Sequence, residues 1–182
     1  MARILMVEPE PGLLAALRSS PLLEGHAVDV AAGSTDAVRR VRRRAFDVLI
    51  TAPDTDPAED EGLLDEIRAA RPGVRIVLLT PRTTPAQVIA ALRKLVFACF
   101  SAPFDASEIA DMVARAAEAD HWKDGIEVLS ATPDWIHVRV NCRLLSAERL
   151  VNFLTELRSD VPDSSRDDFM FAFREVLMNA ME

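Results

Sequence analysis

Residues 46–52 read Phe-Asp-Val-Leu-Ile-Thr-Ala. A short, continuous apolar run of this kind is typical of a strand that is covered on both faces. Four similar runs lie at Ile4–Val7, Ala27–Ala31, Ile76–Thr80 and Phe97–Phe100. Segments with helical periodicity alternate with the five runs, near 11–19, 35–44, 61–70, 84–94 and 106–118. The pattern predicts an α/β domain with a doubly wound, five-stranded parallel sheet and right-handed crossovers, whose site lies at the carboxyl ends of the strands.

Residues that favour helix starts agree with this pattern. Ser34 precedes the second helical segment, Thr83-Thr84-Pro85 opens the fourth, and Asp105 with Ser107 opens the fifth. We therefore expect one domain over residues 1–118, which resembles flavodoxin-like folds in its order of strands and helices.

The pattern changes after residue 118. Residues 119–124 form a polar connector, and Ile126–Leu129 and Trp135–Val140 are typical of two strands. Ser146 is expected to cap a helix that runs to about Arg158, and the segment around Pro162 separates it from a final helix. Residues 125–182 thus predict a partial α+β segment of two strands and two helices.

Composition narrows the class of protein. An apolar fraction of 49% with 27% charged residues is ordinary for a folded protein, and no apolar run reaches the length of a membrane helix. Two cysteines without CxxC spacing favour a reducing, cytoplasmic location. The net charge of −8 argues against binding to nucleic acid or to anionic membranes. We therefore expect neither nucleic acid nor membrane among the partners.

The final helix carries a pair of polar residues that suits a nucleotide site. Glu175 and Asn179 are one helical turn apart and lie beside an apolar stripe. An amide oxygen is a ligand for a hard cation, and a carboxylate can act as a general base. No helix stop signal follows at Met181 or Glu182, so we expect the chain to be a fragment of a longer protein.

Residues 1–118 resemble the receiver domain of response regulators, in which a phosphoacceptor Asp follows the third strand and a Lys follows the fifth. The run 46–51 places Ala52 at the acceptor position, and Thr80 and Ala102 lie 28 and 50 residues further on (80 − 52 and 102 − 52). Both separations match the family. Of the acidic pair after the first strand, Glu8 is present and Pro9 has replaced its neighbour.

The residues at these positions predict a degenerate site. Alanine has no nucleophile for an aspartyl phosphate and no charge to pair with a phosphoryl group. Glu8, Ala52, Thr80 and Ala102 are therefore expected to form a pseudo-receiver site. Asp54 and Asp56 are alternative acceptors in sequence, but an exposed acidic loop is the favoured interpretation.

Residues 125–182 resemble the start of a GHKL-type ATP-binding domain, as found in anti-sigma-factor serine kinases, because Glu175-Val-Leu-Met-Asn179-Ala180 follows the expected order of strand, helix, break and helix. The resemblance implies that Asn179 ligates Mg²⁺ of Mg-ATP and that Glu175 is the general base in the full-length protein. No cofactor is expected for these 182 residues alone, since the adenine and lid motifs of the family are not in them.

Together the two resemblances imply a bacterial signal-transduction regulator. Its receiver-like domain would be an interaction module for a kinase-like domain, with other signalling proteins as partners. We also expect a homodimer through the surface of segments 84–94, 97–100 and 106–118, where such domains commonly associate. A non-enzymatic adaptor, with both halves degenerate, is the alternative.

Overall fold

The computed structural model describes residues 1–52, 57–82, 84–118, 125–131, 136–157 and 163–180. The described chain divides into two units that do not follow the order of the sequence. The first unit is Met1–Pro81 with Phe100–Trp122, and the second is Arg82–Cys99 with Lys123–Glu182. None of the helices in the described ranges has the length and apolar character needed to cross a membrane.

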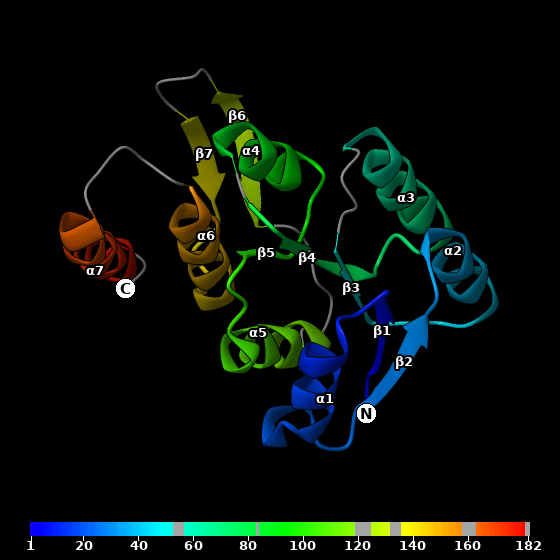
Figure 1. Cartoon of the computed structure of the whole chain (residues 1–182). Helices are drawn as coiled ribbons and strands as arrows, with labels where there is room; N and C mark the ends of the chain where they lie inside the picture. The colour runs from blue at the N-terminus through cyan, green and yellow to red at the C-terminus, as the bar shows by residue number, and fades with distance from the viewer. Residues whose placement is uncertain (53–56, 83, 119–124, 132–135, 158–162, 181–182) are drawn as a thin grey trace. The chain divides into compact units, whose positions relative to one another are not determined.

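A five-stranded parallel sheet is the centre of the fold (Figure 1), which confirms the predicted class. Its strands are β1 (Arg3–Val7), β2 (Ala27–Ala31), β3 (Val48–Thr51), β4 (Arg75–Thr80) and β5 (Ala98–Ser101), in the order β2-β1-β3-β4-β5. Every residue of β3 is buried, as are the last four of β1. Burial on both faces explains why these strands are continuous apolar runs rather than alternating ones.

Helices cover the two faces of the sheet in the first unit. Figure 1 shows α1 (Pro11–Ser19) and α5 (Ala106–Glu118) packed together on one face, and α2 (Ser34–Arg43) and α3 (Pro57–Ala70) on the other. A short 3₁₀ helix, η1 (Pro21–Leu23), packs against α1 and α5. This arrangement places helices on both faces, as the alternating pattern predicts.

The predicted helix starts are partly right. Thr84 forms a capping box with Gln87 at the start of α4 (Pro85–Arg93), and Asp105 accepts hydrogen bonds from the backbone of Ser107 and Glu108. Ser34, in contrast, is the first residue of α2 rather than its cap. Asp36 instead ties this first turn to the preceding loop, because its carboxylate accepts a hydrogen bond from the backbone N–H of Ala32 at 3.1 Å.

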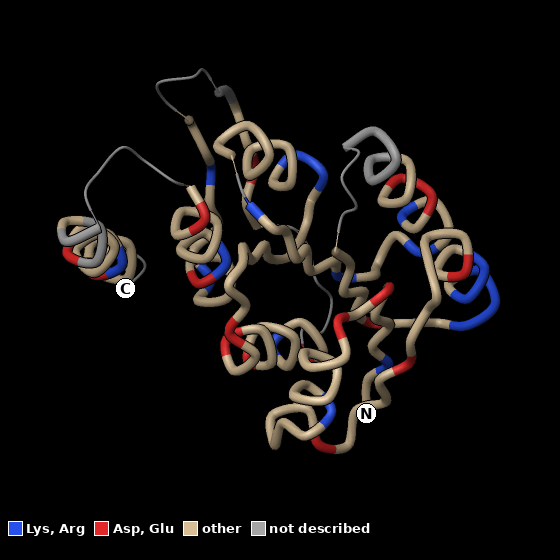
Figure 2. The backbone as a smooth tube through the Cα atoms, viewed as in Figure 1, with Lys and Arg blue, Asp and Glu red and all other residues tan. Residues whose placement is uncertain are grey.

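Helix α2 carries a run of arginines, which Figure 2 shows in blue. Asp36 bonds both Arg39 and Arg40, and Arg42 lies 3.2 Å from Glu66 of α3. These arginines line an open groove between α2 and α3. The groove includes none of the residues predicted for the receiver-like site.

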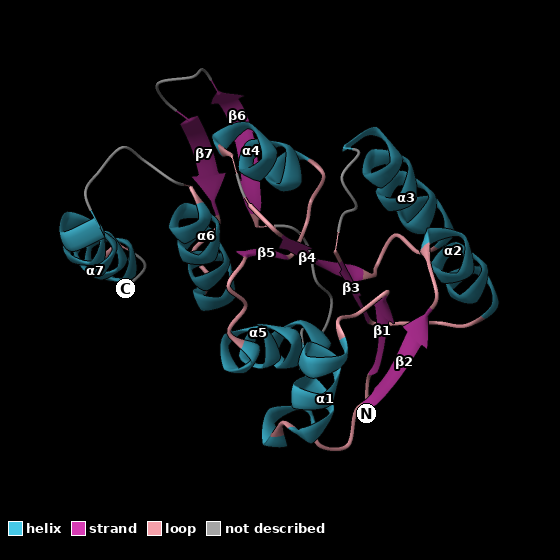
Figure 3. Cartoon of the chain, in the orientation of Figure 1, coloured by secondary structure: helices cyan, strands magenta, loops and turns pink. Residues whose placement is uncertain are grey.

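The second unit contains the predicted strand pair and final helices (Figure 3). Strands β6 (Ile126–Ala131) and β7 (Ile136–Val140) pair antiparallel, and α6 (Leu144–Glu156) and α7 (Asp163–Asn179) follow. Helix α4 packs against β6 and α6, and α6 packs against α7. The connector 119–124 and Trp135 lie outside the described residues, so the predicted domain boundaries stay predictions.

Ser146 does not cap α6, contrary to the sequence prediction. The helix begins two residues earlier, because the carbonyl of Arg143 already accepts hydrogen bonds from the backbone of Ser146 and Ala147. Ser146 is buried, and its hydroxyl lies against Gly125. A Cβ on Gly125 would lie 2.2 Å from Ser146 Oγ and 2.4 Å from Asn141 Nδ2. Only glycine fits at this junction before β6.

Candidate functional site

The four residues predicted for the receiver-like site lie at one edge of the parallel sheet. Val7 pairs with Thr51 in the register of β1 and β3, so the next residues along the chain, Glu8 and Ala52, leave the sheet side by side. Thr80 ends β4, and its carbonyl oxygen accepts a hydrogen bond from the backbone N–H of Ala102 at 3.0 Å. The sheet therefore brings Glu8, Ala52, Thr80 and Ala102 to the carboxyl edge, as the spacing predicts.

The side chains at this edge differ in exposure and in chemistry. Thr80 is 8% exposed, whereas Ala52 is exposed and Ala102 is half-buried. The peptide bond between Ala102 and Pro103 is cis. The methyl groups of Ala52 and Ala102 supply neither a nucleophile nor a positive charge. Asp54 and Asp56, the alternative acceptors, lie outside the described residues.

Glu8 carries the single carboxylate among these four residues. It has a positive φ of 43°, and its backbone N–H donates to the carbonyl of Ala31 at 3.0 Å. Its carboxylate lies beside Gly33, the N-cap of α2, since a Cβ on Gly33 would be 3.7 Å from Glu8 Oε1. A negative charge near a helix N-terminus is stabilised by the helix dipole. The position of Glu8 thus has a structural explanation that involves no metal.

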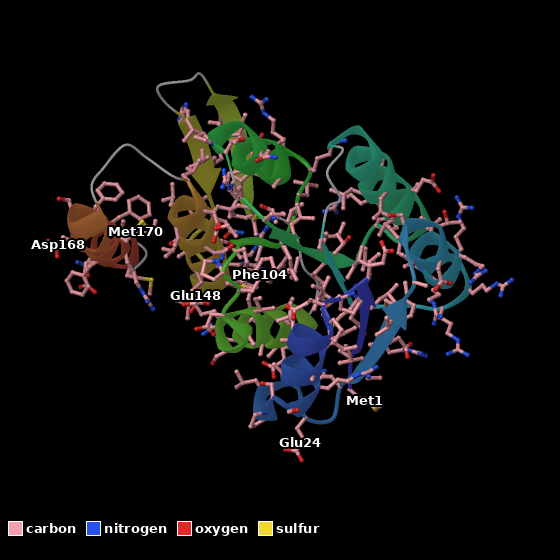
Figure 4. The ribbon with its side chains drawn as sticks, viewed as in Figure 1. Met1, Glu24, Phe104, Glu148, Asp168 and Met170 are labelled. Atoms are coloured by element: carbon pink, nitrogen blue, oxygen red, sulfur yellow. The ribbon has the colours of Figure 1, made fainter. Side chains whose placement is uncertain are left out.

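The second predicted pair lies on α7. Glu175 and Asn179 are both exposed, one turn apart at the end of the helix. Aromatic rings stand out from α7 near the labelled Asp168 and Met170 in Figure 4. Phe169, Phe171 and Val176 are 59%, 69% and 69% exposed, and the rings of Phe169 and Phe173 stack at 6.3 Å.

Residues missed by the sequence reasoning lie on α6. Arg149 is buried, with 1% of its surface exposed, and Asn152 and Glu156 follow at helical spacing. The signal was present in the sequence, because these polar residues interrupt the apolar face that includes Leu150 and Phe153.

The fold of residues 1–118 is that of the CheY-like receiver domains of response regulators. A response regulator from Thermotoga maritima superposes with a TM-score of 0.58 at 16% identity, over 65% of this chain and 99% of that chain. No family model matches the sequence.

Two curated relatives agree with this class. The transcriptional regulatory protein GlrR of Escherichia coli K12 is 28% identical over 156 residues, which cover 82% of this chain and 33% of GlrR. The response regulator protein FleR of Pseudomonas aeruginosa is 28% identical over 116 residues, 64% of this chain and 24% of FleR. The chain thus spans about a third of the first relative and a quarter of the second.

The predicted partners need correction. GlrR is a transcriptional regulatory protein, and a role in transcription brings a protein to nucleic acid, so the exclusion of nucleic acid is contradicted. The exclusion of nucleic acid relied on the net charge of the whole chain. Contacts to nucleic acid depend instead on positive charge at the binding surface.

The expected homodimer through segments 84–94, 97–100 and 106–118 stays a prediction. Four apolar residues lie close together in the sequence of this surface, Leu92, Leu95, Val96 and Phe97. Leu92, Val96 and Phe97 are buried, whereas Leu95 is 40% exposed. Helix α4 packs against β6 and α6 of the same chain, and these contacts do not test self-association.

Proposed function

We propose that this chain is part of a signalling regulator of the transcription-control class, in which residues 1–118 are an interaction module that works without aspartyl phosphorylation. The main support for this proposal is the position of Ala52, which directly follows β3 at the carboxyl edge of the sheet. The likeness to GlrR and FleR supports the class of regulator.

The chemistry of the edge supports the absence of phosphotransfer. Formation of an aspartyl phosphate requires attack by a carboxylate oxygen, and the side chain of Ala52 ends at a methyl group. A cationic side chain that pairs with the phosphoryl oxygens is also missing at Ala102. Thr80 retains a hydroxyl at the edge, but a hydroxyl alone supplies neither function.

The edge is also a poor fit for Mg²⁺. A hard dication in a protein prefers several oxygen ligands, and Glu8 supplies the one carboxylate among the four residues. That carboxylate already lies at the N-terminus of α2. Across the ranges that the structure describes, no group of three or more His, Cys, Asp or Glu side chains could hold a metal ion. The four residues of the edge therefore do not fit Mg²⁺.

Beryllofluoride tests this proposal. With Mg²⁺ it forms a stable mimic of a phosphoryl group on a receptive aspartate, which shifts backbone amide signals at the ends of the strands. We expect the amide signals of Ala52, Thr80 and Ala102 to be unchanged by beryllofluoride with Mg²⁺. Saturable shifts at these three amides would contradict the proposal.

A second candidate function concerns residues 125–182, for which we propose the opening part of an ATP-binding domain. Glu175 and Asn179 support it, because they are exposed one turn apart beside the exposed apolar residues of α7. In the full-length protein, Asn179 would hold the Mg²⁺ of Mg-ATP, and Glu175 would act as the general base that accepts a proton. An amide and a carboxylate on one helix do not enclose a nucleotide, so the described residues fit Mg-ATP only in part.

Titration of the full-length protein with Mg-ATP distinguishes this candidate from an adaptor. ATP binding that Asn179→Ala weakens at least tenfold, about 1.4 kcal/mol, supports an ATP site. Glu175→Gln should leave binding near the native level and reduce turnover, since a general base acts on the acceptor rather than on the nucleotide. Absence of ATP binding would favour the non-enzymatic adaptor.

A further inference from the structure

A polar stripe on α6, formed by Arg149, Asn152 and Glu156, lies against β5 and the residues that lead into it. Arg149 donates from Nε to the carbonyl oxygen of Phe97 at 2.7 Å and from a terminal nitrogen to that of Val96 at 2.9 Å. Its guanidinium also lies 4.8 Å from the centre of the Phe97 ring. Three separate contacts of one side chain thus fasten α6 to the approach to β5.

Asn152 extends these contacts into the strand. Its Oδ1 accepts a hydrogen bond from the backbone N–H of Cys99 at 3.0 Å. Glu156, one further turn along α6, is 9% exposed. Burial and the charge of Glu156 raise the pKa of the Cys99 thiol to about 12. The Cys99 thiol is therefore close to the same stripe.

The position of β5 gives these contacts their importance. β5 is the last strand of the sheet in the order β2-β1-β3-β4-β5. The free side of an edge strand presents backbone N–H and C=O groups that can pair with a strand of another molecule. In this chain the Cys99 N–H and the carbonyls just before β5 are bonded by side chains of α6.

Apolar burial strengthens the same interface. Ala147, Leu150 and Phe153 of α6 are at most 4% exposed, and α6 packs against α4. Val96 and Phe97 are fully buried. A buried arginine is uncommon unless its donors are satisfied. Here two carbonyl oxygens and an aromatic face meet that requirement.

We propose that α6 of the same chain caps the open edge of the sheet at β5 and closes this edge to a strand of another molecule. Arg149 is the positioning residue of this cap. The inference rests on the proposed function, since it concerns an edge of the interaction module. The test of the inference involves no phosphoryl chemistry. The inference about α6 and the proposed function can therefore fail separately.

The reactivity of Cys99 reports whether α6 is seated. Cys99 is 2% exposed, whereas Cys142 is exposed. A Cys142→Ser background leaves Cys99 as the one thiol, and its alkylation by iodoacetamide is followed by intact mass. Arg149→Met removes the three contacts while keeping a long apolar side chain. Arg139→Met is the matched control, because Arg139 lies on β7 and forms an exposed ion pair with Glu127.

We expect Arg149→Met to raise the alkylation rate of Cys99 at least about tenfold, because the charged hydrogen bonds of Arg149 hold α6 against the segment that contains Cys99. Arg139→Met should stay within about twofold of the background, as exposed ion pairs contribute little. Equal rates in the two variants would overturn the proposal.

A second variant covers the case in which Arg149→Met does not fold. Asn152→Ala removes the acceptor of the Cys99 N–H from a half-buried position and is expected to raise the rate about threefold or more. An alkylation rate unchanged within about twofold would overturn the proposal on its own. It would show that Cys99 stays protected without Asn152, so that the polar stripe does not hold α6 in place.

Discussion

Arg149 and Phe97 are joined twice, once through the ring and once through the backbone. The guanidinium lies 4.8 Å from the ring centre of Phe97, and its Nε donates to the carbonyl oxygen of the same residue at 2.7 Å. One residue of α6 thus holds both the side chain and the main chain at the entrance to β5. This pair links α6 to the residues that lead into β5.

The buried arginine should dominate the stability of the second unit. Arg149→Met leaves the carbonyls of Val96 and Phe97 buried without their donor, so we expect the free energy of unfolding to fall by about 3 kcal/mol. The matched change Arg139→Met on the exposed surface should alter it by less than about 0.5 kcal/mol. Urea unfolding followed by circular dichroism measures both. Equal effects would show that Arg149 is not a main support.

Gly125 should tolerate no side chain. Its Cβ would lie 2.2 Å from Ser146 Oγ, so Gly125→Ala must displace α6 or Asn141, and we expect a loss of about 2 kcal/mol. Gly62 in α3 has open space around it, and Gly62→Ala should instead stabilise by about 0.5 to 1 kcal/mol. Thermal unfolding of both variants gives the comparison. A harmless Gly125→Ala would mean that α6 lies further from residue 125.

Asp36 should make the stability of the first unit sensitive to acid. Hydrogen bonds from Arg40, then from the Ala32 backbone and from Arg39, lower the pKa of Asp36 from 3.8 to about 2. A lowered pKa in the folded state means that the charged form stabilises the fold above the unfolded pKa. This contribution is lost as the pH falls from about 4 towards 2.

Urea unfolding of the native chain and of Asp36→Asn across this acidic range tests the sign. The native chain should be the more stable of the two near neutral pH, and the difference should shrink as the pH falls. A difference that grows in acid would contradict the assigned cause.

The receiver-like edge should be repairable. Ala52→Asp supplies a carboxylate beside Glu8, and Ala102→Lys supplies a cation before the cis peptide to Pro103. If the edge has the register described here, the double variant should form an acid-stable, hydroxylamine-sensitive phosphoryl adduct with acetyl phosphate and Mg²⁺. Ala102→Lys alone is the control and should form none. Failure of the double variant would mean that the edge lacks more than these two groups.

The sheet and its carboxyl edge could be predicted from the sequence, because both follow from the order of strand and helix segments along the chain. Five buried runs alternate with helical segments, and the carboxyl ends of parallel strands must share one edge. Ala52, Thr80 and Ala102 therefore reach the expected positions. The starts of α2 and α6 were less certain, because a Ser before a helix and a Ser in its first turn give similar patterns.

The role of α6 could not be predicted in the same way. Arg149 and Phe97 are 52 residues apart, and nothing in a helical pattern states which strand its polar stripe will meet. The apolar residues Leu92, Leu95, Val96 and Phe97 are visible in the sequence, but a sequence does not state which of them pack within the chain. The contacts of the structure place α6 against α4, while Leu95 is 40% exposed, and self-association stays a prediction.

Intact mass spectrometry after incubation with acetyl phosphate and Mg²⁺ tests whether the receiver fold of residues 1–118 accepts a phosphoryl group. We expect one species at the mass of the unmodified chain. A second species heavier by one phosphoryl group, lost on treatment with hydroxylamine, would identify an acyl phosphate and contradict this expectation.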